Sequence, residues 1–176
     1  MKQLLALLLL LPLLCSAQEK LFYSGIITTD STLKKDDLFI SARAWYNKTF
    51  NSSKDVIQII DKETGDISGK GTFKYASNVF RGNDKTAGYI NFSISIFVKE
   101  GKYKYEFSDF IHESINNYDS FGIITTEIDY PRHLSGNIKS WENNVWKDIK
   151  AQIEANTTLL IETLKESMTK KVNSNW

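Results

Sequence analysis

Cysteine and proline are scarce in this chain. Only one of its 176 residues is cysteine and only two are proline. The single cysteine, Cys15, lies in an apolar N-terminal segment, so a domain that lacks this segment can form no disulfide and has no thiol chemistry. No repeat, low-complexity tract or proline-rich linker divides the remaining chain. We therefore expect a single domain after the N-terminal segment.

The chain also lacks an excess of charge of either sign. It carries 22 Lys and Arg residues against 21 Asp and Glu residues, a formal net charge of +1. Loss of the N-terminal segment removes Lys2 and no acidic residue, so the remaining domain has a net charge of 21 − 21 = 0. Domains that bind nucleic acid or an anionic membrane surface have a basic patch. We therefore expect no nucleic-acid partner.

The one long hydrophobic run is at the N-terminus. Lys2 precedes an apolar stretch, Leu4–Leu14, and small residues follow at Cys15 and Ala17. This pattern is typical of a secretory signal peptide that is cleaved after Ala17. The stretch is shorter than the roughly 20 residues that span a bilayer. We therefore predict a signal peptide over 1–17, a mature domain over 18–176, and no transmembrane segment in the mature chain.

Two alternatives concern this segment. It can remain as a membrane anchor, or the protein can be a lipoprotein modified at Cys15. Lipidation is disfavoured because Leu14 stands where bacterial sites usually have a small residue. The first strand pattern also starts near Lys20, which leaves almost no tether. We predict an exported protein, either periplasmic or secreted.

Hydrophobic alternation predicts most of the remaining structure. Strands are expected where apolar residues recur every second position, and helices where they recur every three or four positions. Asp30, Ser31 and Thr32 offer oxygens to cap the first helix. The expected strands are 20–29, a strand from 55, 67–75, 89–99, 102–112 and a final short strand in 121–126; the expected helices run from 30–32 to about 47 and from 141 to 170.

The two longest strand patterns predict a hairpin with a defined register. A turn at Glu100-Gly101 with an even number of residues pairs Val98 with Tyr103. The same register pairs Ile96 with Tyr105 and Ile94 with Phe107. A slip of one residue would place lysines opposite isoleucines, so the pattern fixes which residues share a face.

The order of elements predicts an α+β fold. It is β-α-β-β-β-β-(β)-α, a single antiparallel sheet of about five to six strands with two helices on one face. The long C-terminal helix has an apolar stripe that must dock on the sheet to make the helix stable. The stripe consists of Val145, Ile149, Ile153, Leu160, Leu164 and Met168.

Three stretches of the chain resemble a known family. They are KDVIQIIDKETGDISGKGTFKY (Lys54–Tyr75), INFSISIFVKEGKYKYEFSDF (Ile90–Phe110) and the lysine-rich terminal helix. Together they are similar to the exported bacterial family called domain of unknown function 4468, over essentially the whole mature chain. The resemblance implies a TBP-like fold. It implies no activity and no catalytic residues, and the TBP label describes chain topology rather than DNA binding.

Two acidic or histidine motifs suggest metal chemistry. His112-Glu113 begins like the zinc-protease HExxH helix, but the fifth position is Asn116 and the pattern is that of a strand. Asp61, Glu63 and Asp66 gather oxygen ligands as a calcium loop does, but their spacing departs from the EF-hand and suits an ordinary turn. We therefore predict no metal site.

Other motifs also have structural explanations. Gly69-Lys70-Gly71 lies within a strand and lacks the spacing of a phosphate loop, so close packing against the helices explains it better. His133 and Asp129 could form a base and its orienting carboxylate, but no nucleophile is evident. Trp141 and Trp146 suit helix packing better than sugar stacking. We therefore predict no catalytic and no cofactor-binding residues.

The sheet face away from the helices has an unusual composition. In the predicted register it carries polar residues along both hairpin strands. Four larger side chains interrupt this polar surface: Tyr89, Phe97, Phe110 and His112. Either the loop from Asn116 to Tyr130 covers them, or they form an exposed contact patch.

These observations favour a non-enzymatic binding or interaction module of the bacterial envelope or exterior. The expected partner is an unknown protein or a small ligand, and no cofactor is expected. One alternative is a small-ligand carrier with an apolar cavity between the sheet and the C-terminal helix. Another is an enzyme whose site has no recognisable motif.

Overall fold

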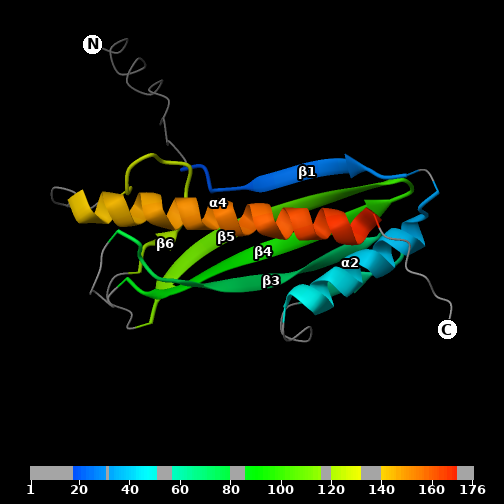
Figure 1. The fold of residues 1–176 in the computed structure, drawn as a ribbon, viewed down its shortest axis with the longest axis horizontal. Helices are drawn as coiled ribbons and strands as arrows, with labels where there is room; N and C mark the ends of the chain where they lie inside the picture. Colours follow the sequence, from blue (N-terminus) through cyan, green and yellow to red (C-terminus); the bar gives the residue numbers. More distant parts are fainter. Residues whose placement is uncertain are drawn as a thin grey trace, which may run out of the picture.

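The computed structural model describes residues 18–30, 32–50, 57–79, 86–115, 120–131 and 140–169, and the predicted signal peptide lies outside them. Within these ranges the chain forms one six-stranded sheet with two helices packed on one face (Figure 1). The predicted order of elements and the α+β class are confirmed. The elements are β1 (Tyr23–Thr28), α2 (Lys35–Thr49), β2 (Ile57–Asp61), β3 (Asp66–Tyr75), β4 (Gly88–Lys99), β5 (Lys102–Ser114), β6 (Gly122–Ile123) and α4 (Ser140–Thr169).

The strand order is β1-β5-β4-β3-β2, with β6 also paired to β5, and every pairing is antiparallel. Strand β5 has 13 residues and pairs with two different strands along one edge. Its first half, Lys102–Phe107, pairs with β1, and Ile111–His112 pairs with β6. The strand therefore changes partner part-way along its length.

The core lies between the sheet and the two helices. On β4, all five apolar residues predicted for one face are buried: Ile90, Phe92, Ile94, Ile96 and Val98. The α4 stripe is buried as predicted, except that Leu160 is only partly buried. Each large apolar side chain contributes about 1.5–3 kcal/mol when it is fully buried. The stripe therefore anchors α4 lengthwise along the sheet (Figure 1).

The two helices also contact each other. The Trp45 indole N–H donates to Thr163 Oγ1 at 3.1 Å, and Ser167 Oγ donates to the Ser41 carbonyl at 3.2 Å. Tyr46 on α2 is fully buried, and its hydroxyl donates to the Ile94 carbonyl at 2.9 Å. Burial of that hydroxyl raises the pKa of Tyr46 well above its ordinary value. Helix α2 is thus held both to α4 and to the centre of the sheet.

The start of α2 differs from the prediction. The helix begins at Lys35 rather than next to Asp30–Thr32. Asp30 Oδ1 accepts a hydrogen bond from the Thr32 N–H, so it closes a local turn instead of capping the helix. The Lys34 N–H donates to Asp37 Oδ2 inside the first helical turn. Aspartate side chains stabilise either a turn or a helix start, and here Asp30 stabilises the turn.

The predicted hairpin register is confirmed up to Phe107, and a β-bulge follows. Val98, Ile96 and Ile94 pair with Tyr103, Tyr105 and Phe107. Between the pairs Ser93–Ser108 and Asn91–Ile111, β5 has one more residue than β4, and Asp109 has a φ of 53°. An extra residue reverses the alternation of side chains beyond it.

Because of the bulge, the predicted positions of two candidate contact residues are wrong. Phe110 and His112 lie on the helix-facing side and are fully buried, not on the far face. Phe110 stacks on Phe92, with ring centroids 5.5 Å apart, and meets Tyr23 edge-on at 5.8 Å. The sequence carries one sign of this change: strict alternation beyond Phe107 would bury Asp109, and the polar pair Ser108-Asp109 breaks the pattern there.

Gly71 faces the helices in tight packing, as predicted. A Cβ atom at Gly71 would lie 2.5 Å from Phe92 Cζ and 3.1 Å from Phe50 Cε1. Gly69, two residues earlier in β3, is also buried. Gly71 therefore leaves room for aromatic rings, which agrees with the structural explanation of this motif.

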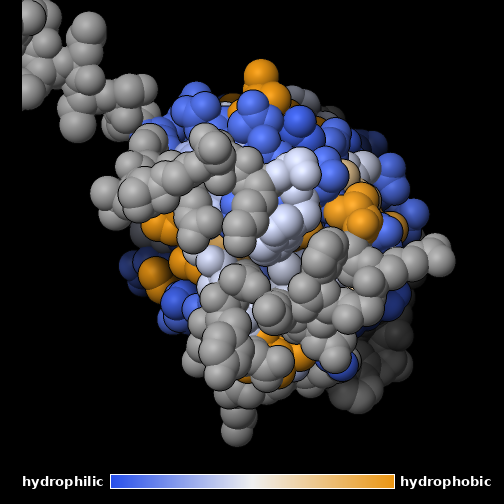
Figure 2. Space-filling view, turned by 90° about the vertical axis from the view of Figure 1, so that its left-hand side faces the viewer, coloured by the Kyte–Doolittle hydropathy of each residue, from blue (hydrophilic) through white to orange (hydrophobic). Residues whose placement is uncertain are grey.

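Exposed apolar side chains are spread over many elements. Figure 2 faces the end of the molecule at which α4 begins and shows hydrophobic residues in small, separate groups among hydrophilic ones. Among the described helices, none is both long enough and apolar enough to cross a membrane. Scattered single apolar residues are normal on protein surfaces and need no special explanation.

Candidate functional site

The sheet face away from the helices remains open near Phe97. The side chains of Phe97 and Tyr89 lie there, and Tyr89 is 40% exposed. The loop from Asn116 to Tyr130, which was expected to cover this face, lies at the sheet edge and in the core in its described part. Its β6 strand extends the edge of the sheet beside β5, and its Phe121 packs against His112. The prediction for Tyr89 and Phe97 as far-face residues is therefore consistent with the register, whereas Phe110 and His112 belong to the core.

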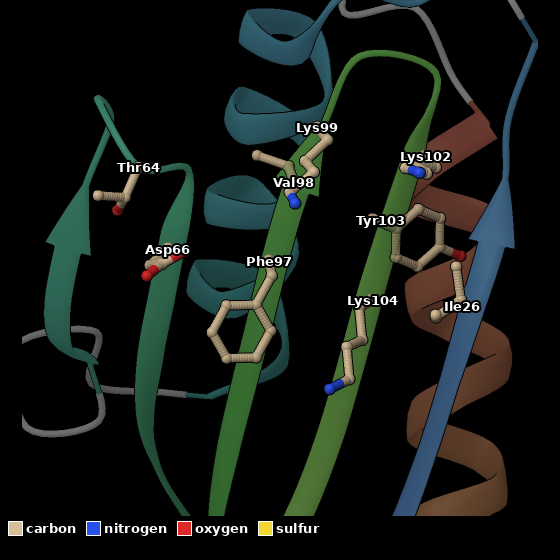
Figure 3. Close-up of a pocket in the computed structure, with 9 residues that line it drawn as sticks. All are labelled: Ile26, Thr64, Asp66, Phe97, Val98, Lys99, Lys102, Tyr103 and Lys104. Atoms are coloured by element: carbon tan, nitrogen blue, oxygen red, sulfur yellow. The ribbon is translucent and has the colours of Figure 1, made fainter.

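A hollow of about 430 Å³ lies on this face at the β4–β5 hairpin end (Figure 3). Two adjacent rows of cross-strand neighbours line it. One row is Ile26, Lys104, Phe97 and Asp66, from β1, β5, β4 and β3 in that order. The second row, nearer the turn, is the pair Lys102 and Lys99. The hollow thus combines an apolar surface with three lysines.

Two of these lysines face each other directly. Lys99 and Lys102 are cross-strand partners, and both are exposed. Like charges placed directly opposite each other destabilise a sheet. Among the described residues, no carboxylate lies within ion-pair distance of either lysine. The pair therefore costs stability, and nothing in the described part of the fold compensates for it.

The nearest acidic residues have other partners. Glu100, in the turn between the two lysines, accepts a hydrogen bond from the Lys35 backbone N–H at 3.1 Å. Its carboxylate therefore points to the start of α2. Lys104 forms an ion pair with Glu106 further along β5, and its Nζ lies 5.8 Å from the centre of the Phe97 ring. The two lysines without an ion-pair partner in the described structure thus lie at the turn end of the hollow.

The turn between β2 and β3, through Thr64, forms the wall of the hollow opposite Ile26 on β1. Gly65 has a φ of 87°, and its carbonyl accepts a hydrogen bond from the Val98 N–H at 2.9 Å. A Cβ at Gly65 would lie 2.4 Å from the Val98 carbonyl oxygen, so glycine is required there. Lys35 Nζ donates to the Glu63 carbonyl at 2.5 Å. Lys35 therefore ties this turn and the hairpin turn to the same end of α2.

Asp61 is part of the same turn, for which a calcium loop is one interpretation of the sequence. Its Oδ1 accepts hydrogen bonds from the Glu63 and Thr64 N–H groups at 2.8 and 3.2 Å. These bonds, led by the one from Thr64, lower the pKa of Asp61. The described residues contain no group of three or more His, Cys, Asp or Glu arranged to hold a metal ion. The Asp61 carboxylate thus has a structural role in closing this turn.

His112 lies in the core with both ring nitrogens in use. Nδ1 accepts a hydrogen bond from the Phe121 N–H at 3.1 Å, and Nε2 is 2.9 Å from the Thr86 carbonyl. Because Nδ1 must be an acceptor, the proton of the neutral ring is on Nε2 and is donated to Thr86. Burial lowers the pKa of His112. The ring is therefore a neutral structural element rather than a zinc ligand.

Two further candidate residues, Trp146 and Asp129, lie among the described residues. Trp146 is fully buried and donates its indole N–H to the Glu127 carbonyl at 3.0 Å, so it serves helix packing. His133 lies outside the described residues. The Asp129 carboxylate, its suggested partner, forms an ion pair with Lys147 at 3.4 Å. Trp146 and Asp129 therefore have structural roles in the described part of the chain.

The family model for a domain of unknown function with TBP-like fold, DUF4468, matches residues 23–113, more than half of the chain. The chain belongs to the DUF4468 family. The match covers the sheet from β1 to most of β5 and includes every residue of the two rows that line the hollow. The hollow is thus built from the family domain itself.

Two crystal structures resemble the DUF4468 chain in fold. A DUF4468 family protein from Bacteroides ovatus ATCC 8483 is 12% identical, with a TM-score of 0.58 over 88% of this chain and 90% of that one. A TBP-like protein from Parabacteroides distasonis ATCC 8503 is 15% identical, with a TM-score of 0.54 over 83% of this chain and 93% of that one. At these identities the likeness shows the fold alone. A comparison with curated proteins finds no match.

The lysine pair in this DUF4468 chain was not recognised from the sequence, although the predicted hairpin register contained it. The predicted hairpin register already placed Lys99 opposite Lys102, because the pairing of Val98 with Tyr103 fixes the next pair. What the sequence could not give was the direction of Glu100. In an isolated hairpin that carboxylate would be the natural partner of both lysines.

Proposed function

We propose that the protein is an exported, non-enzymatic binding module that uses the open sheet face at the β4–β5 hairpin end. The observation that carries this proposal is the hollow around Phe97. Its volume of about 430 Å³ lies within the roughly 300–1,000 Å³ of small-molecule sites. Phe97 is half-buried in this polar surface, and aromatic side chains are frequent anchors of protein contacts.

The distribution of reactive groups also supports binding over catalysis. A general acid or base must be within reach of a substrate and have a free proton-transfer atom. His112 meets neither condition, because it is fully buried and both its nitrogens contact backbone groups. Three lysines beside Phe97 and Ile26 line the hollow, and this combination of charge and apolar surface suits recognition.

The carrier alternative requires space between the sheet and α4. In the described structure, large side chains fill that layer. Trp146, Ile149 and Ile153 from the helix, and Phe107 and Phe110 from the sheet, are all fully buried. Phe92 packs against the two sheet phenylalanines, with ring centroids 6.3 and 5.5 Å away. We therefore favour a surface site over an internal cavity.

Native mass spectrometry tests the proposal on protein purified from the organism that produces it. We expect an added mass, from a ligand or partner, that is retained by the wild type and lost from Phe97→Ser. The control is Leu159→Ser, which replaces a 59% exposed apolar residue on α4. If Phe97→Ser keeps the added mass, or if the control loses it equally, the sheet face is not the binding surface.

A further inference from the structure

We infer that the hollow binds a small organic anion, with the charged group held between Lys99 and Lys102 and the apolar body resting on Phe97. This inference deepens the proposed function, on which it rests, by giving the chemical class of the ligand. It begins from the repulsion between the two lysines. Because they are direct cross-strand partners without an ion-pair partner among the described residues, an anion between them relieves a cost that the free protein carries.

The surroundings keep the site positive. Lys99, Lys102 and Lys104 line the hollow, and among the residues that the structure describes Asp66 is the one acidic residue that lines it with them. Asp66 lies beyond Phe97, in the row further from the hairpin turn. Glu100 is directed to the α2 backbone at Lys35 and Glu106 pairs with Lys104. An anion at the turn end therefore meets two unpaired ammonium groups, whereas one at the Asp66 end would be repelled.

The apolar part of the site sits beside the charged part. Figure 3 shows Phe97 and Ile26 on either side of Lys104, below the two lysines at the turn. Ile26 is 68% exposed, so the β1 side of the hollow is apolar as well. Aromatic and aliphatic surfaces bind the body of a ligand, while few polar groups fix its orientation. This arrangement fits an aryl or alkyl group with a carboxylate or phosphate head.

The walls of the hollow are held in place before any ligand binds. The Gly65 carbonyl accepts the Val98 N–H, and Lys35 links the β2–β3 turn and the hairpin turn to α2. Preorganised walls lower the entropy cost of binding. This rigidity favours a small ligand, which needs a defined shape, over an extended acidic peptide.

The test is an NMR titration of the mature protein with naphthoate and with naphthyl phosphate. We expect saturable binding, with amide shifts confined to the ends of β4 and β5, to β1 and to the turn at 62–65. Affinity should fall as salt is raised, because exposed charges are screened. Naphthamide, which has no charge, and inorganic phosphate, which has no ring, should each bind at least about tenfold more weakly. The two anionic probes distinguish a carboxylate site from a phosphate site.

Charge reversal gives the decisive variant. Lys102→Glu should weaken naphthoate or naphthyl phosphate binding by about tenfold or more, since it replaces attraction with repulsion. The same change places Glu opposite Lys99, so the melting temperature should rise by roughly 1–4 °C. Loss of binding with a gain in stability excludes unfolding as the cause. The matched control, Lys70→Glu, reverses an exposed lysine opposite Ser93 on the same face and outside the hollow.

Several outcomes would overturn the inference. These are no saturable binding of either anionic probe, equal binding of naphthamide or inorganic phosphate, and equal weakening by Lys70→Glu and Lys102→Glu. If the anionic probes fail while Phe97→Ser still removes the mass retained in native mass spectrometry, the ligand class is wrong and the proposed function stands. If the probes bind as expected but Phe97→Ser leaves that mass in place, the retained ligand lies outside the hollow, and the inference falls together with the proposed function.

Discussion

Replacing Phe110 and Phe97 separately by alanine tests the bulge in β5. Simple alternation from the hairpin places both residues on the far face, whereas the structure buries Phe110 completely and leaves Phe97 partly exposed. Phe110→Ala removes a ring that stacks on Phe92 and meets Tyr23 edge-on. A buried Phe→Ala change costs about 3–5 kcal/mol, and the two aromatic contacts place this one near the upper end.

Phe97→Ala should cost much less. The ring loses a Lys104 contact at 5.8 Å, worth about 0.5–1 kcal/mol at an exposed site, together with part of its own packing. We therefore expect a difference of roughly 3 kcal/mol in unfolding free energy between the two variants. At about 2–4 °C per kcal/mol for a domain of this size, the melting temperature of Phe110→Ala should be lower by roughly 6–12 °C.

Urea unfolding followed by tryptophan fluorescence measures both free energies, since Trp45 and Trp146 are buried. The m-value should stay unchanged, so that a shift in midpoint reports stability alone. Equal and small losses of stability in the two variants would refute the bulge as the reason why the two phenylalanines lie on opposite faces.

Three further predictions address packing, pH and processing. Gly71→Val should lower the unfolding free energy by about 1–3 kcal/mol, because its side chain meets the Phe92 ring; a urea midpoint equal to that of the wild type would contradict this. Burial lowers the pKa of His112, so the neutral ring stabilises the fold above the pKa of about 6.5 that the residue has in the unfolded chain. As the pH falls below that value, the unfolding free energy should drop by up to about 1.4 kcal/mol per pH unit until the folded pKa is reached. In denaturation curves across this range, His112→Asn should be less stable but should lack this slope, and an unchanged slope would exclude His112 as its source. Intact-mass analysis of the exported protein should give Gln18 as the first residue, and a lipid-modified Cys15 would disprove cleavage after Ala17.

Sequence periodicity determined the architecture of this protein. The apolar alternation of β4 and the stripe of α4 predicted which residues form the core, because burial follows directly from period-2 and period-3.6 patterns. The hairpin register also followed from the sequence, since one slip would bury lysines. The same register contains the Lys99–Lys102 pair, so the hairpin sequence alone determines that these two lysines face each other.

Tertiary structure alone decided the rest. Strand β5 leaves β1 and joins β6 around Asp109, and the extra residue at that change moves Phe110 and His112 into the core. The polar pair Ser108-Asp109 breaks the alternation in the sequence, but the change of partner strand depends on where β1 and β6 lie. Likewise, Glu100 accepts a hydrogen bond from Lys35, 65 residues earlier in the chain, and so leaves the two lysines without their nearest carboxylate. The sequence determines which side chains lie on a strand, but only the packing of distant elements determines which charges remain unpaired.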